Sequence, residues 1–470
     1  MHPVRSKFSV VTMFLTAICL VMQARSQERQ PIDFHHEYQT RYIELWKQDQ
    51  PQSKVNAIEL LNRIHTTLRS LVDQYVVEHP DTLWMKVLPY FSGCGLLADP
   101  DADDLDTQVS KWILSKIEST DIPRLLKSLT EPIVSHGQVT TGLVLAMPMP
   151  ELGHARVISR LCIARASVAL ERGDRDGYVQ HISEALAVAA HISHGPNLGA
   201  HFVGLPLRAN ALDSVRLAVV NTELLDTHLA ALVSAISKYE CAHISKALQG
   251  EEIMTQNATE FVWVGGPPAL HALMGDPKDT AAITLNRASP VIPFKSPLEP
   301  GMPNYESQLK VVAEFYSLIE SMYELSLKQR NEKYGLTALD VYKENELLMV
   351  FTSGLTRGMK TSDFFAAQLQ GTRIILALQQ YYNAHGKYPS QLEHLVPAYL
   401  GELPHDPYTG GVLGYKLQVN QPTENGWPYI LYAAGVDTVD NSGKVNFQDP
   451  WRDRSAAGVD LLLSDGKKIK

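Results

Sequence analysis

Apolar residues recur at helical spacing through most of the first 360 residues of the chain. Between residues 33 and 78 they follow one another at intervals of three, four and seven, which is typical of a helix with one buried face. A helical hairpin is predicted from 151 to 194, with a turn at Gly173-Asp174 and a stop at Gly195-Pro196. The pattern therefore predicts a large all-α part built from helical hairpins.

The hydrophobic pattern changes its period in the last hundred residues. A helical run over 363–385, with Thr361 and Ser362 as predicted capping residues, carries one apolar stripe. After Asp406-Pro407 apolar and polar residues alternate over 415–419, which predicts a strand, and two further strands are predicted near 429–433 and 459–463. The fold class predicted is α+β, with one long helix packed on a small antiparallel sheet after the all-α part. The stripe expected to face the sheet consists of Phe364, Ala367, Gly371, Ile374, Leu378 and Tyr381.

The order of these C-terminal motifs resembles a known family. The long helix leads into Gly386-Lys387-Tyr388-Pro389, a short Leu-rich helix at 390–397, an Asp-Pro and paired aromatic strands. This succession resembles the soluble domain of the type II secretion major pseudopilins (type II secretion system protein G-like), over about residues 364–465. The remainder resembles exported bacterial helical proteins whose helical part has no assigned role. The resemblance implies a fold for the module, and a fold alone does not transmit a function.

One departure from that family bears on function. Pseudopilins begin with a cleaved leader and an exposed, wholly apolar helix that packs into the core of the fibre. Here the corresponding helix is internal, follows some 360 residues and carries Gln368, Gln370 and Arg373. We therefore expect that the chain does not polymerise in that way and that the module serves as a folded appendage.

These patterns divide the chain into five parts, because 470 residues exceed what one hydrophobic core usually serves. The predicted parts are a signal peptide (1–26), a helical domain (27–260), a Pro/Gly-rich excursion (261–304), a helical connection (305–360) and a pseudopilin-like α+β domain (361–470).

The N-terminus has the pattern of a signal peptide. Arg5 and Lys7 precede an uncharged apolar run over 8–22, and Ala24-Arg25-Ser26 has small residues where a signal peptidase reads the chain. The run is shorter than the ~20 residues that span a bilayer comfortably, so a retained anchor is the weaker alternative. We expect cleavage after Ser26, no transmembrane helix in the mature chain, and a periplasmic or extracellular location.

The net charge limits the possible partners, and the cysteine count limits the possible disulfides. The formal charge of −9 becomes −12 when the three basic residues of the predicted signal peptide are removed. Nucleic acid is therefore not an expected partner, because phosphate contacts are made by clustered Lys and Arg. Apart from Cys19 in the predicted signal peptide, the chain has three cysteines at wide spacing, Cys94, Cys162 and Cys241. They allow at most one disulfide, and the sequence does not choose the pair.

The resemblance also implies a calcium site in the loop before the last strand. The matching positions are Asp437 and Asp440 in the segment 434–441, and Asp460 just before the strand. A hard cation needs several oxygen ligands, which aspartates and loop carbonyls supply. The alternative is a solvated acidic loop, since an insertion over 444–457 brings cations that could pair with the same carboxylates. These cations are Lys444, Arg452 and Arg454.

Two other groups of residues suggest metal chemistry without establishing it. Glu151 with His154, and Glu240 with His243, have the Glu-x-x-His spacing of di-iron carboxylate proteins, although the two bridging glutamates are not evident. Four histidines surround Gly195-Pro196 and suggest zinc, but partners of a helix dipole or half-buried core groups are the favoured interpretation. These histidines are His181, His191, His194 and His201.

The sequence contains none of the common catalytic motifs: no Gly-x-Ser-x-Gly, Gly-rich phosphate loop, His-Glu-x-x-His or Cys-x-x-Cys. We expect an exported protein that acts in non-catalytic interaction or structural support in the cell envelope, with another envelope protein as its partner. The oligomeric state is left open. The alternative is a metal-dependent enzyme, a hydrolase or an oxidoreductase, with its site in the helical part and the Pro-rich excursion as a lid.

Overall fold

The computed structural model describes residues 36–79, 105–135, 149–274, 305–335, 355–418, 426–445 and 458–464, with the single positions 144, 339, 342, 345, 348 and 423. The predicted signal peptide, Cys94, Arg452 and Arg454 lie outside these residues. The described part contains twelve α-helices and one three-stranded antiparallel sheet, which confirms the α+β class at this coarse level. Within it, no helix is both long and apolar enough to cross a membrane.

The first eight helices in chain order are α2 (His36–Lys47), α3 (Ala57–Glu78), α6 (Leu105–Ile117), α7 (Ile122–Leu129), α8 (Glu151–Glu171), α9 (Arg175–Ser193), α10 (Leu198–Asn221) and α11 (Asp226–Lys238). They are followed by α12 (Ile244–Met274), α14 (Tyr305–Tyr323), α15 (Leu327–Tyr334), α17 (Leu355–His385) and the short 3₁₀-helix η3 (Leu392–Leu395). The strands are β1 (Gly414–Leu417), β2 (Tyr429–Ala433) and β3 (Leu461–Leu462).

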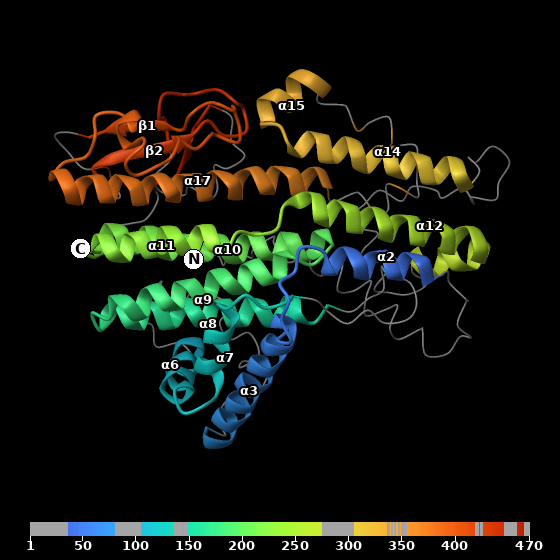
Figure 1. Ribbon diagram of the computed structural model, residues 1–470, viewed down its shortest axis with the longest axis horizontal. Coiled ribbons are helices and arrows are strands. Elements are labelled where there is room, and N and C mark those ends of the chain that lie inside the picture. The colour runs from blue at the N-terminus through green and yellow to red at the C-terminus, as the bar shows by residue number, and fades with distance from the viewer. Residues whose placement is uncertain are drawn as a thin grey trace.

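The elements form a stack of layers, as Figure 1 shows. The sheet lies over α17, α17 lies over α10 and α11, and those two helices pack on the hairpin of α8 and α9. The hairpin turns where the sequence predicts it: Gly173 has a φ of 73°, and the Asp174 carboxylate accepts the N–H of Gly177 (2.9 Å) as the N-cap of α9. On the other side, α2 and α14 pack against α12.

The structure differs from the predicted boundaries at two helices. Helix α17 begins at Leu355, so Thr361 and Ser362 lie inside it and are not its caps. The added turns are stabilised by packing, because Leu355 and Met359 are buried in a second apolar cluster with residues of α12 and α14. Helix α12 runs to Met274, so the segment predicted to leave the helical domain at residue 261 begins as helix. Residues 275–304 lie outside the described part.

Helix α17 is buried on two faces. The predicted stripe meets the sheet: Ile374 and Leu378 are fully buried, and a Cβ on Gly371 would come within 2.9 Å of the Leu463 side chain. The opposite face docks on the bundle, where the Arg216 guanidinium of α10 donates to the Thr372 hydroxyl (2.9 Å) and Arg373 pairs with Glu240. One apolar cluster runs from α3 to the last strand, so the module is not the appendage expected from the sequence.

The sheet has the order β1-β2-β3, with Tyr415 opposite Leu431 and Tyr432 opposite Leu462. Its three strands lie within or beside the segments predicted from the sequence, although β3 is short. One face packs on α17. The other face has a small apolar cluster of its own, formed by Ile430, Tyr432 and Leu462 with Val445 against it. The strand β2 is therefore buried on both faces.

Candidate functional site

The predicted acidic residues lie in one loop at the end of the sheet. The two carboxylate oxygens of Asp460 accept the backbone N–H groups of Asn441 (2.9 Å) and Gly443 (2.7 Å). Asp437 accepts the N–H of Val439 (3.1 Å) and, across the loop, the N–H of Gly458 (2.6 Å). The carboxylates therefore hold the loop in its shape.

Asp440 ties the same loop to the sheet. One of its oxygens accepts the Ser442 N–H (2.7 Å) and the Tyr432 hydroxyl (3.1 Å). Lys444, one of the cations expected to pair with the aspartates, instead uses its carbonyl to accept the Asp460 N–H (2.8 Å). The loop thus lies against the outer face of the sheet, at Tyr432.

The pKa values of the loop carboxyls follow from these contacts. Burial raises the pKa of Asp437, but the N–H groups of Gly458 and Val439 outweigh it and leave the pKa below its usual value. Burial raises the pKa of Asp460 more than the N–H groups of Asn441 and Gly443 lower it. The carboxyl of Asp437 is therefore held as an anion more firmly than that of Asp460.

The loop carboxylates do not converge on a common point as a cation would require. Calcium takes six to eight oxygen ligands at about 2.3–2.6 Å. Here the oxygens of Asp437, Asp440 and Asp460 are directed at N–H donors, and the described residues include no group of three His, Cys, Asp or Glu side chains placed to hold a metal ion. A calcium site stays a prediction from the resemblance, and it needs these carboxylates to exchange N–H donors for a cation.

Removal of the Asp460 carboxylate is expected to destabilise the loop. The side chain is 1% exposed, so Asp460→Ala leaves two backbone N–H groups without their acceptor, at about 1–3 kcal/mol. Asp440→Ala is the matched control, because this aspartate is exposed and water replaces it. Urea unfolding measures both losses. Equal losses in the two variants would contradict the bracing role of Asp460.

The two Glu-x-x-His pairs have separate surroundings. Glu151 is buried at the start of α8, and the Nδ1 of His154 lies 2.8 Å from Asn62 Oδ1 on α3. Glu240 pairs with Arg373 of α17, while His243 lies 3.4 Å from Glu324, the residue after α14. Neither pair forms part of a metal-binding group within the described residues.

The histidines around Gly195-Pro196 also have individual partners. His181 Nδ1 lies 3.0 Å from Glu184, and His191 lies between the Ser135 hydroxyl and the Leu129 carbonyl. Burial, then Lys246, lowers the pKa of His194 to about 4; burial, then Arg208, lowers that of His201 to about 3. These values correspond to neutral, half-buried or buried core histidines, the interpretation favoured from the sequence.

Sequence reasoning missed a buried ionic network between α8 and α9. Glu184 is fully buried and accepts from Arg165 Nη1 (3.1 Å), His181 Nδ1 (3.0 Å) and Gln180 Nε2 (3.0 Å). Arg165 reaches on to the exposed Glu118 with its other terminal nitrogen (2.9 Å). A signal was present, since Arg165 and Glu184 each interrupt an apolar helical run. The contacts serve helix pairing and are closed to a substrate.

A second unpredicted polar junction lies where α2, α10, α12 and α14 meet. Glu251 of α12 accepts the Leu198 N–H (2.8 Å) at the start of α10, where a helix favours an anion. The neighbouring Tyr42 hydroxyl of α2 accepts from the Asn197 amide (3.2 Å). Burial raises the pKa of the Glu251 carboxyl to about 7, and the Leu198 N–H opposes that rise. The junction thus contains a carboxyl that titrates near neutral pH.

The variant Glu251→Gln is expected to change the pH dependence of stability. A carboxyl whose pKa rises from 4.5 to about 7 on folding contributes stability below pH 4.5, and this contribution is lost as the pH rises through 7. Between pH 5 and 8 the wild type should lose about 2–3 kcal/mol relative to the variant, which keeps an acceptor for Leu198. Urea unfolding at both pH values measures this, with the exposed Glu44→Gln as control. Parallel pH profiles would contradict the assignment.

A surface groove of about 630 Å³ lies between α2 and α12. Charged residues of both signs line it, with Leu45 and Ile253 at its base. Its charges are partly satisfied within the wall, since Arg41 donates to Gln256 (3.2 Å), and Gln256 donates to Glu252 (2.8 Å). The arrangement favours neither an anion nor a cation.

Comparison of the chain with family models, with curated proteins and with solved structures found no match.

Proposed function

We propose that this protein is exported and acts in the cell envelope through non-catalytic interaction or structural support, with a pseudopilin-like module at its C-terminus and another envelope protein as its partner. The observation that carries the proposal is the position of α17 between the sheet and the bundle. In the family that the module resembles, the long helix is the element through which subunits assemble. Here both faces of α17 are used within the chain. A partner must therefore meet the outer layer, which is the sheet that covers α17.

The outer layer is firmly attached to the rest of the molecule. The N–H groups of Leu327 and Lys328, at the start of α15, donate to the carbonyls of Pro407 (2.9 Å) and Tyr408 (2.8 Å). The buried Asp406 carboxylate in the same turn accepts from the Tyr408 N–H (2.8 Å) and from the Ala434 N–H at the end of β2 (2.9 Å). A load applied to the sheet is therefore passed to the helical part, as a structural role requires.

A buried ion pair strengthens this attachment. Arg330 of α15 pairs with Asp363 of α17, and both side chains are largely excluded from water. Burial raises the pKa of Asp363 to about 6, although Arg330 lowers it. These buried polar contacts join elements of the C-terminal part to one another. They favour a role in interaction or structural support over a catalytic role.

Site-specific photo-crosslinking in the native envelope tests the proposal. A photoreactive residue at Val412, 53% exposed and two residues before β1, should give a discrete adduct with an envelope protein. A matched probe at Val77, 79% exposed at the far end of α3, controls for random encounter. The same adducts from both positions, or none from either, would contradict the proposal, as would an N-terminus of the mature chain that lies before residue 27.

The calcium prediction is tested on the same purified protein. If the resemblance extends to the metal, calcium raises the melting temperature of the wild type but not that of Asp437→Ala. An equal melting temperature with calcium and with chelator would remove calcium from the proposal and leave the interaction role standing. Tightly bound zinc or iron in metal analysis would instead support the alternative of a metal-dependent enzyme.

A further inference from the structure

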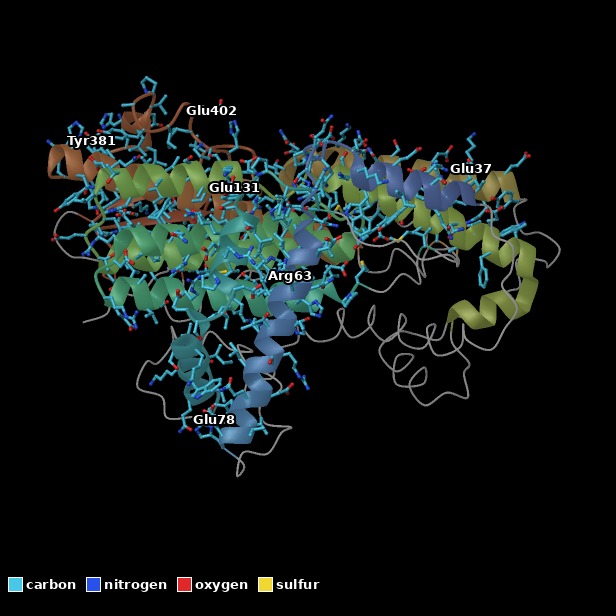
Figure 2. The ribbon with its side chains drawn as sticks, turned by 60° about the horizontal axis from the view of Figure 1, so that its bottom comes forward. Glu37, Arg63, Glu78, Glu131, Tyr381 and Glu402 are labelled. Carbon is cyan, nitrogen blue, oxygen red and sulfur yellow. The ribbon has the colours of Figure 1, made fainter. Side chains whose placement is uncertain are left out.

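Helix α3 projects from the bundle and forms an arm with α6 and α7, which pack along it. Figure 2 shows Arg63 on the part of α3 near the body of the protein and Glu78 at the far end of the arm. The arm is attached at its base, where α3 contacts α8 and α7 contacts α9. These contacts, with a smaller one between α3 and α9, hold the arm to the bundle.

The contact of α3 with α8 contains a pair of stacked histidines. The rings of His65 on α3 and His154 on α8 lie face to face, with centroids 3.8 Å apart and planes 16° apart. The Nδ1 of His154 lies 2.8 Å from the Asn62 side-chain oxygen, so this nitrogen carries the hydrogen and donates it. Stacking of this kind costs least while both rings are neutral, because a proton on either ring places a charge in the partly buried contact between the two helices.

The charges around the pair oppose protonation. Burial, then the neighbouring His65, lowers the pKa of His154 to about 4, and burial, then Arg69, lowers the pKa of His65. The charged groups that act on the two rings are thus Arg69, one turn further along α3 and paired with Asp73 (3.4 Å), and the rings themselves.

The contact of α7 with α9 also passes through a histidine. His191 Nε2 lies 2.8 Å from the carbonyl of Leu129, the last residue of α7, and its Nδ1 lies 2.5 Å from the Ser135 hydroxyl. Because the carbonyl can only accept, Nε2 carries the hydrogen and Nδ1 accepts from Ser135. Burial lowers the pKa of His191, although the Leu129 carbonyl opposes this. A second proton would turn Nδ1 into a donor, and the Ser135 hydroxyl would then have to rotate and accept.

We propose that the stacked pair His65 and His154 is an acid-sensitive joint, which holds the arm to the bundle at neutral pH and releases α3 from α8 when a ring takes up a proton. Release exposes the apolar face of α3 that includes Leu61, Ile64 and Leu68, all buried in the closed arrangement. The inference goes beyond the proposed function and does not depend on it.

The sign and size of the effect follow from linkage. A histidine whose pKa falls from 6.5 to about 4 on closing the joint stabilises the closed form above pH 6.5 and loses that effect as the pH falls toward 4. For His154 alone, the equilibrium constant for opening should rise about 30-fold between pH 7.5 and 5. His191 adds to the rise where opening also frees α7.

Hydrogen exchange of the α3 amides, followed by mass spectrometry on the full chain, tests the joint. After correction for the intrinsic pH dependence of exchange, the wild type should open about 30-fold more readily at pH 5 than at pH 7.5. The double variant His65→Phe/His154→Phe keeps two stacked aromatic rings but has no titrating group. It should therefore lose the ~30-fold pH dependence of opening. His79→Phe is the matched control, since this ring lies on the same helix, 4.1 Å from Tyr75 of its own helix.

Three results would contradict the proposal of an acid-sensitive joint. One is a wild type whose α3 exchange has no corrected pH dependence, another is a double variant that keeps the full rise, and the third is a control that loses it. A measurement without substitutions covers the case in which the double variant fails to fold. NMR titration of the wild type should place the pKa of His154 well below that of an exposed histidine, and an ordinary value of about 6.5 would contradict the proposal.

Discussion

The substitution Glu184→Ala is expected to lower the free energy of unfolding by about 3–5 kcal/mol, because it leaves the buried Arg165 without its buried partner. Glu184 is fully excluded from water and receives three hydrogen bonds from α8 and α9. Loss of the carboxylate leaves these donors facing a cavity in the centre of the hairpin. Equilibrium unfolding in urea measures the change. The variant Glu184→Gln keeps the shape of the side chain, so its free energy of unfolding should lie between those of the wild type and Glu184→Ala.

The same guanidinium provides the matched control for this prediction. Glu118 also pairs with Arg165, at 2.9 Å, but its side chain is 68% exposed. Glu118→Ala should therefore lose no more than about 1 kcal/mol, since water replaces the exposed carboxylate. Comparable losses in the two alanine variants would show that burial does not decide the strength of this network.

The substitution Gly250→Ala is expected to cost about 3 kcal/mol, although alanine favours a helix. A Cβ at this position of α12 would lie 1.7 Å from the carbonyl oxygen of Pro196 and 2.5 Å from its carbon, so α12 must move away from the turn between α9 and α10. The movement also weakens the contact of Glu251 with the Leu198 N–H. Chemical unfolding measures the loss, and a shift of the melting temperature should accompany it.

Gly153→Ala on α8 separates steric conflict from helix propensity. An added Cβ there meets no atom within 4 Å, so this variant should gain about 0.5 kcal/mol from the lower entropy of the unfolded chain. If Gly250→Ala were as stable as Gly153→Ala, the close approach of α12 to Pro196 would not be a constraint on the fold.

The elements of the C-terminal part could be predicted from sequence because their signals are local. The run at 429–433 is apolar throughout, and the structure has β2 at those residues. The end of the long helix at His385 is marked by Gly386, which has a φ of 68°. In both cases the residues that fix the element lie within a few positions of it.

The packing of the second face of α17 on the bundle could not be predicted, because it depends on residues far away in the sequence. Arg373 was interpreted as a departure from the pseudopilin pattern, and Thr372 carried no signal at all. Both side chains contact the bundle, Arg373 through Glu240 and Thr372 through Arg216. A polar residue on an apolar helix can be read as exposed or as paired, and only the partner decides between the two.

The acidic loop shows a similar limit at the candidate site. The sequence places Asp437, Asp440 and Asp460 around one loop, and they do lie together there. Whether their oxygens face a cation or N–H groups is decided by backbone angles, such as the φ of 60° at Thr438 and 59° at Ser442. Such angles are not encoded by residue type alone, since neither position is a glycine.

The position of α17 between the bundle and the sheet has a consequence for the order of folding. The ribosome makes α10 and α11 more than a hundred residues before it makes most of α17. The side of the bundle that α17 covers is therefore exposed until α17 has been synthesised, and its apolar side chains can meanwhile contact other chains. A chaperone, or fast translation of the segment that contains α17, would protect this nascent surface.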